Sequence, residues 1–162
     1  MNKLIATFFG AGLLKPAPGT WGSLAALPFV WLLHVLGGPW LFGVAIVAVF
    51  LIGWWATRGY TAMTGVEDPS EVVIDEVVGM WIAMLPVSIG AAAAGAGIFA
   101  LYPGWIAAFF LFRFFDIVKM GPVRWADDRG DAMGVMLDDV FAGIFAAIVV
   151  IALAGFSHLV LM

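Results

Sequence analysis

Three long stretches without a charged residue constrain the fold of this chain more than any other feature. No Asp, Glu, Lys or Arg occurs at positions 16–57, 77–112 or 140–162. Hydrophobic residues make up 64% of the chain and charged residues only 11%, and the mean hydropathy is +1.10. Such values are typical of helical membrane proteins and lie outside the range of soluble domains. The sequence therefore predicts an integral membrane protein.

These stretches divide into segments that are suited to membrane helices. A helix needs about 20 apolar residues to cross the hydrocarbon core, and fewer where the bilayer thins locally. Gly37-Gly38-Pro39 and Pro103-Gly104 interrupt two of the stretches. We therefore predict an all-α, polytopic bundle of about five membrane helices that forms a single domain over residues 1–162. The predicted spans cover 23–36, 40–57, 77–102, 105–115 and 140–162.

The charged residues fall on one side of this arrangement. Because the turns near 37–39 and 95–104 carry no charge, all charges lie in the N-terminal segment, in 58–76 or in 113–139. A five-helix zigzag places these three regions on the same face of the membrane. The basic residues there include Lys3, Lys15, Arg58, Lys119, Arg124 and Arg129. The positive-inside rule predicts that this face is cytoplasmic.

Net charge and residue types exclude several classes of function. The formal net charge of −4 and the absence of a basic aromatic patch argue against nucleic-acid binding. With no cysteine in the chain, thiol nucleophiles, thiolate metal sites and disulfides are excluded. The two histidines, His34 and His158, fall toward the uncharged face, where we expect interfacial residues rather than acid–base catalysts.

Asp75 and Glu76 stand directly before the second charge-free stretch. A carboxylate in hydrocarbon costs at least about 2.5–3.5 kcal/mol, so acids in membrane helices are candidates for function. Helix capping is the alternative, because Asp68 or Ser70 can cap a helix here and acids in its first turn suit its dipole. Gly79, one turn beyond Asp75, lets another helix or a ligand come close. We favour metal binding or catalysis for this pair.

Asp138 and Asp139 repeat the arrangement before the last charge-free stretch, again with a small residue about one turn later. The two motifs place four carboxylates at helix mouths on one face. Adjacent acids repel each other in the absence of a cation. Hard oxygen ligands of this kind favour Mg²⁺, which keeps several waters and is usually completed by substrate phosphate. We therefore predict Mg²⁺ ligands at Asp75, Glu76, Asp138 and Asp139.

Arg113, Asp116 and Lys119 recur at every third position and so share one side of a helix end. A structural ion pair between Arg113 and Asp116 is one interpretation. In the functional interpretation, Arg113 and Lys119 hold phosphate oxygens while Asp116 joins the metal site. The nearby residues Asp127, Asp128 and others up to Asp131 are predicted to form a solvated loop.

A loop rich in proline and glycine, residues 15–23, precedes the first membrane helix. Thr20 and Ser23 can cap that helix, which by itself would explain the two hydroxyls. Its free N–H groups also form an anion site, which Lys15 reinforces. Since Lys15 lies on the charged face, we favour contact with a phosphate.

Taken together, four motifs in this order resemble the phosphatidylglycerophosphatase A family, and the resemblance extends from about residue 8 to 150. The motifs are the runs 15–23, 73–79, 112–119 and 134–143. The resemblance implies a Mg²⁺-dependent lipid phosphatase of the bacterial inner membrane. Such enzymes remove the terminal phosphate of phosphatidylglycerophosphate to give phosphatidylglycerol. The family usually has a proline directly after the motif lysine, whereas Met120 follows Lys119 here.

A phosphomonoester dianion must be neutralised, held and attacked in line. We expect one or two Mg²⁺ ions and an attacking water that the metal activates, with a phospho-aspartate as the alternative. The predicted catalytic residues are Asp75, Glu76, Asp116, Asp138 and Asp139. The predicted substrate-binding residues are Lys15, Thr20, Ser23, Arg113 and Lys119.

Two functions of other classes would also use acids at helix mouths. A divalent cation transporter needs a polar path, and the charge-free stretches supply no polar residues at mid-depth. A non-catalytic membrane scaffold with a structural divalent ion is the second. Independently of function, the Ala- and Gly-rich run 90–97 is suited to packing against a second copy, so a homodimer is expected.

Overall fold

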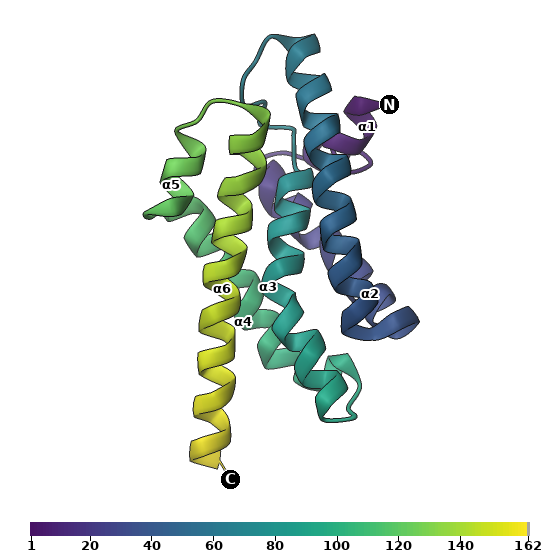
Figure 1. Ribbon diagram of the computed structural model, residues 1–162, viewed down its shortest axis with the longest axis vertical. Helices are drawn as coiled ribbons and strands as arrows, with labels where there is room; N and C mark the ends of the chain where they lie inside the picture. Colours follow the sequence, from purple (N-terminus) through teal and green to yellow (C-terminus); the bar gives the residue numbers. More distant parts are fainter. Residues whose placement is uncertain (162) are drawn as a thin grey trace.

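A computed structural model describes residues 1–161, which are all-helical, with 82% helix and no strand in the described range. This confirms the predicted all-α class. The elements are α1 (Asn2–Ala6), η1 (Ala11–Leu13), α2 (Pro18–Thr64), α3 (Ile74–Ala93), η2 (Ile98–Leu101), α4 (Tyr102–Val118), α5 (Pro122–Asp127) and α6 (Ala132–Leu161) (Figure 1).

By length and composition, four segments of the described chain could cross a membrane, namely α2, α3, the η2–α4 segment and α6. The long α2 contains two of the predicted spans. Gly37 and Gly38 have non-helical backbone angles and kink it, and the φ of Gly38, 62°, suits a residue without a Cβ. With the two arms of α2 taken separately, the helices match the predicted bundle of about five.

The predicted break between the third and fourth spans is misplaced. The sequence suggested Pro103-Gly104, but α3 ends at Ala93, and Gly95 turns the chain with a φ of 59°. Pro103 lies instead in the first turn of α4, where the missing N–H removes no helical hydrogen bond.

The predicted start of the last helix is also wrong. α6 begins at Ala132 rather than at Val140, because the Asp131 carboxylate accepts a hydrogen bond from the Gly134 N–H at 2.7 Å, as an N-cap does. Asp138 and Asp139 therefore lie in the second turn of α6 and not at its mouth.

Helix α3 lies at the centre of the bundle, in contact with α2, α4 and α6 (Figure 1). Its side chains Val77, Met80 and Met84 are fully buried. The Trp81 indole donates to the Ala26 carbonyl of α2 at 3.0 Å, which fixes the two helices side by side. The central helix thus has a rigid setting for the acids of its first turn.

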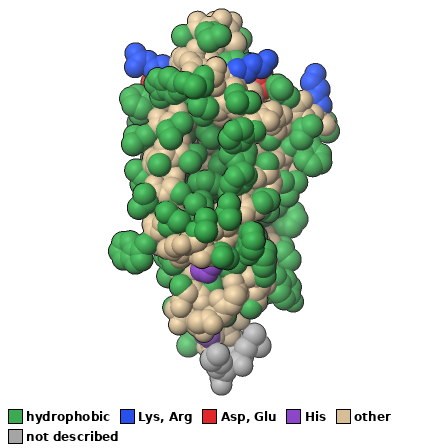
Figure 2. Space-filling view, turned by 90° about the vertical axis from the view of Figure 1, so that its right-hand side faces the viewer, with side chains coloured by type: hydrophobic (Ala, Val, Ile, Leu, Met, Phe, Trp, Pro, Cys, Tyr) green, Lys and Arg blue, Asp and Glu red, His purple; other side chains and the backbone are tan. Residues whose placement is uncertain are grey.

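The outward sides of the bundle are apolar, whereas Lys and Arg side chains gather at one end in Figure 2. Large exposed hydrophobic residues occur along α2, α4 and α6, among them Val44, Phe110 and Ile148. Extended apolar surfaces of this kind suit contact with lipid tails. The charged end is the end at which α3 begins, so the acids of its first turn lie at the same end as the Lys and Arg side chains.

Candidate active site

A cavity of about 310 Å³ opens at the charged end of the bundle. It is bordered by the start of α2, the loop before α3, the first turn of α3, the end of α4, the end of α5 and the second turn of α6. Its acidic residues are Asp68, Asp75, Glu76, Asp116, Asp127, Asp138 and Asp139, and its basic residues are Arg113 and Lys119. Seven carboxyl groups against two cationic groups leave an excess of negative charge that favours binding of cations.

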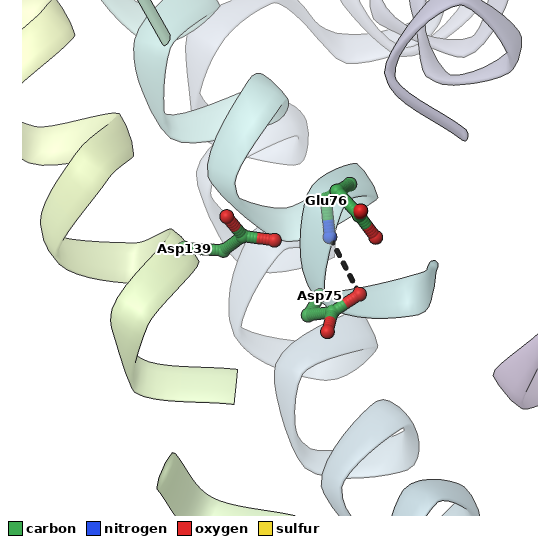
Figure 3. Close-up of side chains that lie close together, drawn as sticks. All are labelled: Asp75, Glu76 and Asp139. Carbon is green, nitrogen blue, oxygen red and sulfur yellow. Dashed lines mark hydrogen bonds between the residues drawn. The ribbon is translucent and has the colours of Figure 1, made fainter. Parts of the chain in front are cut away.

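Three of these acids form a compact cluster, with one carboxylate oxygen of each within 4.8 Å of the others: Asp75, Glu76 and Asp139 (Figure 3). We call this cluster the acidic triad. Asp75 and Asp139 are 6% and 3% exposed. Glu76 Oε2 and Asp139 Oδ1 are buried and have no hydrogen-bond partner in the described structure. Buried, unsatisfied carboxylate oxygens at this spacing are the ligand set that a hard divalent cation prefers.

Two glycines bring the triad together. A Cβ on Gly79 of α3 would lie 2.6 Å from the Asp139 carbonyl oxygen, and a Cβ on Gly143 of α6 would clash with the Gly79 carbonyl. Without side chains at this crossing, the two helix backbones touch. Gly79 follows Asp75 by one turn, and Gly143 follows Asp139 by one turn. The predicted close approach of another helix at Gly79 therefore occurs, and the partner is the second acidic motif.

Lys119 and two further acids occupy the neighbouring side of the cavity. The Lys119 ammonium donates to Asp138 Oδ2 at 3.1 Å and to the Asp127 carboxylate. Burial alone would lower the pKa of Lys119, but the hydrogen bonds and charges of Asp127 and Asp138 outweigh it and raise that pKa above its usual range. Lys119 is therefore a fixed positive charge at the mouth of the cavity.

Arg113 supplies the second cation of the cavity. Its Nη1 lies 2.9 Å from Asp116 Oδ2, so the ion pair considered in the sequence is present. The directions of the N–H groups do not fit a hydrogen bond, however, and the buried Nε and Nη1 have no hydrogen-bond partner in the described structure. The guanidinium keeps donors for an anionic ligand while Asp116 balances its charge.

The first turn of α2 closes the cavity on the third side. α2 begins at Pro18, and Gly19 lies so close to the triad that a Cβ there would clash with the Glu76 carboxylate and lie 3.1 Å from Arg113 Nη1. The N–H groups of a first helical turn are free to bind an anion. A glycine at this position lets the backbone itself approach the site.

The loop before α3 completes the wall. Asp68 and Ser70 line the cavity, and burial raises the pKa of Asp68, an effect that the Lys119 charge opposes. Neither residue caps α3, because the residue at the N-cap is Val73 and it makes no side-chain cap bond. Glu71 lies outside α3 and accepts a hydrogen bond from the Tyr60 hydroxyl at 2.9 Å. Asp68 and Ser70 are therefore not caps of α3, whereas Asp75 and Glu76 do lie in its first turn, where acids suit the helix dipole.

The family model for phosphatidylglycerophosphatase A matches residues 4–154, which is most of the chain. This chain belongs to the phosphatidylglycerophosphatase A family. It is 43% identical to the phosphatidylglycerophosphatase A of Haemophilus influenzae, over 93% of this chain and 86% of that protein. The corresponding protein of Escherichia coli is 36% identical, over 89% of this chain and 78% of its own length.

A third relative, from Bacteroides thetaiotaomicron, is 40% identical over 91% of this chain and 89% of its own length. Its provisional name is phosphatidylinositol-3-phosphatase. All three names describe phosphatases of phosphorylated lipids. No solved structure matches the chain.

The sequence predicted ten site residues for this member of the phosphatidylglycerophosphatase A family. Seven of them line the cavity: Asp75, Glu76, Arg113, Asp116, Lys119, Asp138 and Asp139. Lys15, Thr20 and Ser23 are not among its lining residues. Ser23 is not a helix cap either, since its hydroxyl donates to the Gly19 carbonyl at 2.9 Å from inside α2. The helix begins earlier than predicted because Pro18 is suited to a first helical turn.

Several lining residues were not assigned to the site by the sequence interpretation, among them Asp127 and Gly19. Asp127 was placed in a solvated loop, but it ends α5 and binds Lys119. Gly19 was treated only as part of a tight loop, although its position directly after Pro18 at a helix start is a local signal for close backbone approach. No pattern in the sequence indicates that Asp127 rather than Asp128 faces the cavity.

Proposed function

We propose that this chain is a Mg²⁺-dependent phosphatidylglycerophosphatase, which hydrolyses phosphatidylglycerophosphate to phosphatidylglycerol and inorganic phosphate. The acidic triad carries the proposal, because it lies beside two cationic side chains at the charged end of an apolar bundle. Membership of the phosphatidylglycerophosphatase A family supports the same substrate.

The triad residues fit a divalent cation. Each of the three offers a carboxylate oxygen within 4.8 Å of the others, and Mg²⁺ prefers hard oxygen ligands of this kind. Two buried oxygens of the set, Glu76 Oε2 and Asp139 Oδ1, have no hydrogen-bond partner in the described structure. Asp75, Glu76 and Asp139 would hold the ion. When bound, the cation supplies charge neutralisation for the phosphate and lowers the pKa of the attacking water.

The other lining residues hold the phosphate. An acidic cavity repels a phosphomonoester dianion unless donors face it. Arg113 Nε is a buried donor without a hydrogen-bond partner in the described structure, and the guanidinium donors that Asp116 leaves free would bind phosphate oxygen. The free N–H groups of the first turn of α2 lie next to them, because Gly19 has no side chain. In-line displacement forms a bond between the water oxygen and phosphorus and breaks the bond between phosphorus and the lipid oxygen. The water gives up a proton, and the lipid oxygen takes up a proton and leaves as the alcohol.

The position of the cavity suits a lipid substrate. A cavity at the end of the membrane helices lies at the depth of lipid head groups, so the phosphate can enter while the acyl chains stay against the apolar sides of the bundle. We propose that the protein is multi-pass in the bacterial inner membrane with this face toward the cytoplasm, as the Lys and Arg distribution suggests. A homodimer stays a prediction.

Phosphate release from phosphatidylglycerophosphate in detergent micelles, with Mg²⁺ and with EDTA, tests the proposal. Parallel reactions with phosphatidylinositol 3-phosphate and phosphatidic acid test the head group. We expect turnover that requires Mg²⁺ and prefers phosphatidylglycerophosphate. The same protein in proteoliposomes reports divalent cation flux, the property that a transporter would show. Flux without hydrolysis, or no hydrolysis by a folded protein that binds Mg²⁺, would overturn the proposal.

The nucleophile is tested separately. We propose a water, so acid quenching of reactions with substrate labelled in the terminal phosphate should leave no label on the protein. Label on an aspartate would instead identify a phospho-aspartate and overturn the proposed mechanism without affecting the proposed substrate.

A further inference from the structure

Lys119 is held from two helices at once. Its ammonium donates to Asp138 of α6 and to Asp127 at the end of α5. A lysine ammonium has three N–H donors. Two are used by these carboxylates, and the third remains for a ligand in the cavity that all three residues line. The two carboxylates thus fix the position of the Lys119 ammonium and leave one of its N–H groups able to bind an anion.

The backbone around Lys119 brings Asp127 into this position. Lys119, the first residue after α4, has a φ of 49° in the left-handed region, and Gly121 has a φ of 54°. These two residues reverse the chain so that α5 starts at Pro122 and its last residue, Asp127, returns to the Lys119 side chain. A non-glycine residue in the left-handed region is disfavoured, because its Cβ crowds the following carbonyl oxygen. The pair between Lys119 and Asp127 is a contact across this reversal of the chain.

Asp128, the residue next to Asp127, does not share the contact with Lys119. The Asp128 side chain is 67% exposed, lies 3.8 Å from Arg124 Nε and does not line the cavity. Asp127 and Asp128 are adjacent and carry the same group, yet only Asp127 faces Lys119. The chain therefore contains its own control for the effect of a carboxylate at this end of α5.

We propose that Asp127 is a positioning residue, which holds the Lys119 ammonium in the orientation that binds the substrate phosphate. The inference rests on the proposed phosphatase function. Without Asp127, Asp138 is the remaining partner, so the Lys119 ammonium is held from one helix instead of two. Asp127 acts on the substrate only through Lys119, so its effect depends on the presence of that lysine.

A double-mutant cycle tests this dependence. We expect Asp127→Asn to lower kcat/KM by about tenfold, mainly through a higher KM, and Asp128→Asn to leave it unchanged. Asp127→Glu should recover part of the loss because it restores the charge. In a Lys119→Gln background, Asp127→Asn should have no further effect. A loss in that background as large as in the wild type would show an independent structural role and overturn the proposal.

A second readout does not depend on activity. The only lysines are Lys3, Lys15 and Lys119, so competitive acetylation followed by mass spectrometry resolves each one. We expect Lys119 to react several-fold faster in Asp127→Asn than in Asp128→Asn, with Lys3 and Lys15 as internal references. Equal rates in both variants would overturn the proposal. If the wild type hydrolyses no phospholipid, the proposed function fails, while the labelling still shows whether Asp127 holds Lys119.

Discussion

The carboxylates on the two sides of the cavity differ in whether a lysine forms a salt bridge with them. On one side, the triad of Asp75, Glu76 and Asp139 is packed into the α3–α6 crossing, and no lysine or arginine in the described structure forms a salt bridge with it. On the other side, Asp127 and Asp138 share the ammonium of Lys119. The first set has no direct ion-pair partner on the described residues, and the second set has one.

Because of this difference, the adjacent residues Asp138 and Asp139 have different partners. Asp138 and Asp139 are neighbours on α6, and each first aspartate of the two motifs accepts a hydrogen bond from the next N–H at 2.9 Å. Despite this likeness, Asp139 joins the triad, whereas Asp138 binds Lys119. We infer that external cations go to the triad side and that the Lys119 side serves the anionic substrate.

The largest expected effect compares the two aspartates of α6. Asp139→Asn removes a triad ligand and should weaken Mg²⁺ affinity by more than about 100-fold, with turnover lost at millimolar Mg²⁺. Asp138→Asn should weaken Mg²⁺ affinity by about tenfold, the lower end of the range for a group outside the metal's direct ligands. Titration calorimetry of both variants in detergent measures the difference. Equal loss in the two would break the comparison and make Asp138 a metal ligand.

The next prediction concerns the backbone beside the triad. Gly19→Ala places a methyl group against the Glu76 carboxylate, and overpacking of about 1–3 kcal/mol should reduce kcat/KM by about 10- to 100-fold. Gly43→Ala is the matched control, since a Cβ at this helical position meets no atom within 4 Å. Unchanged turnover of Gly19→Ala beside a normal control would show that the first turn of α2 does not contact the site.

The helix crossing that assembles the triad should be sensitive to one methyl group. Gly143→Ala forces α6 away from the Gly79 carbonyl and should destabilise the protein by about 1–3 kcal/mol while weakening Mg²⁺ binding. Gly155→Ala, on the same helix with open space around it, should do neither. Thermal unfolding in detergent, with and without Mg²⁺, separates the two effects. A wild-type response to Mg²⁺ in Gly143→Ala would mean that the triad tolerates a wider crossing.

The smallest effect is expected at the start of α6, where Asp131 does not line the cavity. Asp131→Ala removes the cap of Gly134 and should cost about 1 kcal/mol, whereas Asp131→Asn keeps the acceptor and should cost less. Hydrogen bonds from Arg129 and from the Gly134 N–H lower the pKa of Asp131. Its stabilising contribution is therefore present above the unfolded value of about 3.9 and is lost as pH falls through the lower folded value. Thermal unfolding between pH 3 and 7 measures it.

Much of the fold could be predicted from the sequence because burial in lipid acts on each segment independently. The charge-free stretches alone determined an all-α membrane bundle, since an apolar segment of this length satisfies its backbone polar groups only as a helix in lipid. The same argument singled out Asp75, Glu76, Asp138 and Asp139, because acids beside such segments are expensive without a partner. The end of α3 at Ala93 and the start of α6 at Ala132 were not predicted, because helix boundaries depend on single capping and turn residues.

Only the tertiary structure decided which of the candidate residues act together. Successive residues of a helix point about 100° apart, so the crossing of α3 and α6 at Gly79 and Gly143 determines that Asp139, and not Asp138, meets the α3 acids. The return of α5 likewise places Asp127 on Lys119 and leaves Asp128 outside. The sequence by itself determined the membrane bundle and its acidic motifs. The contacts between helices divided those acids into a cation side and a lysine side, because long-range packing sets the direction of each side chain.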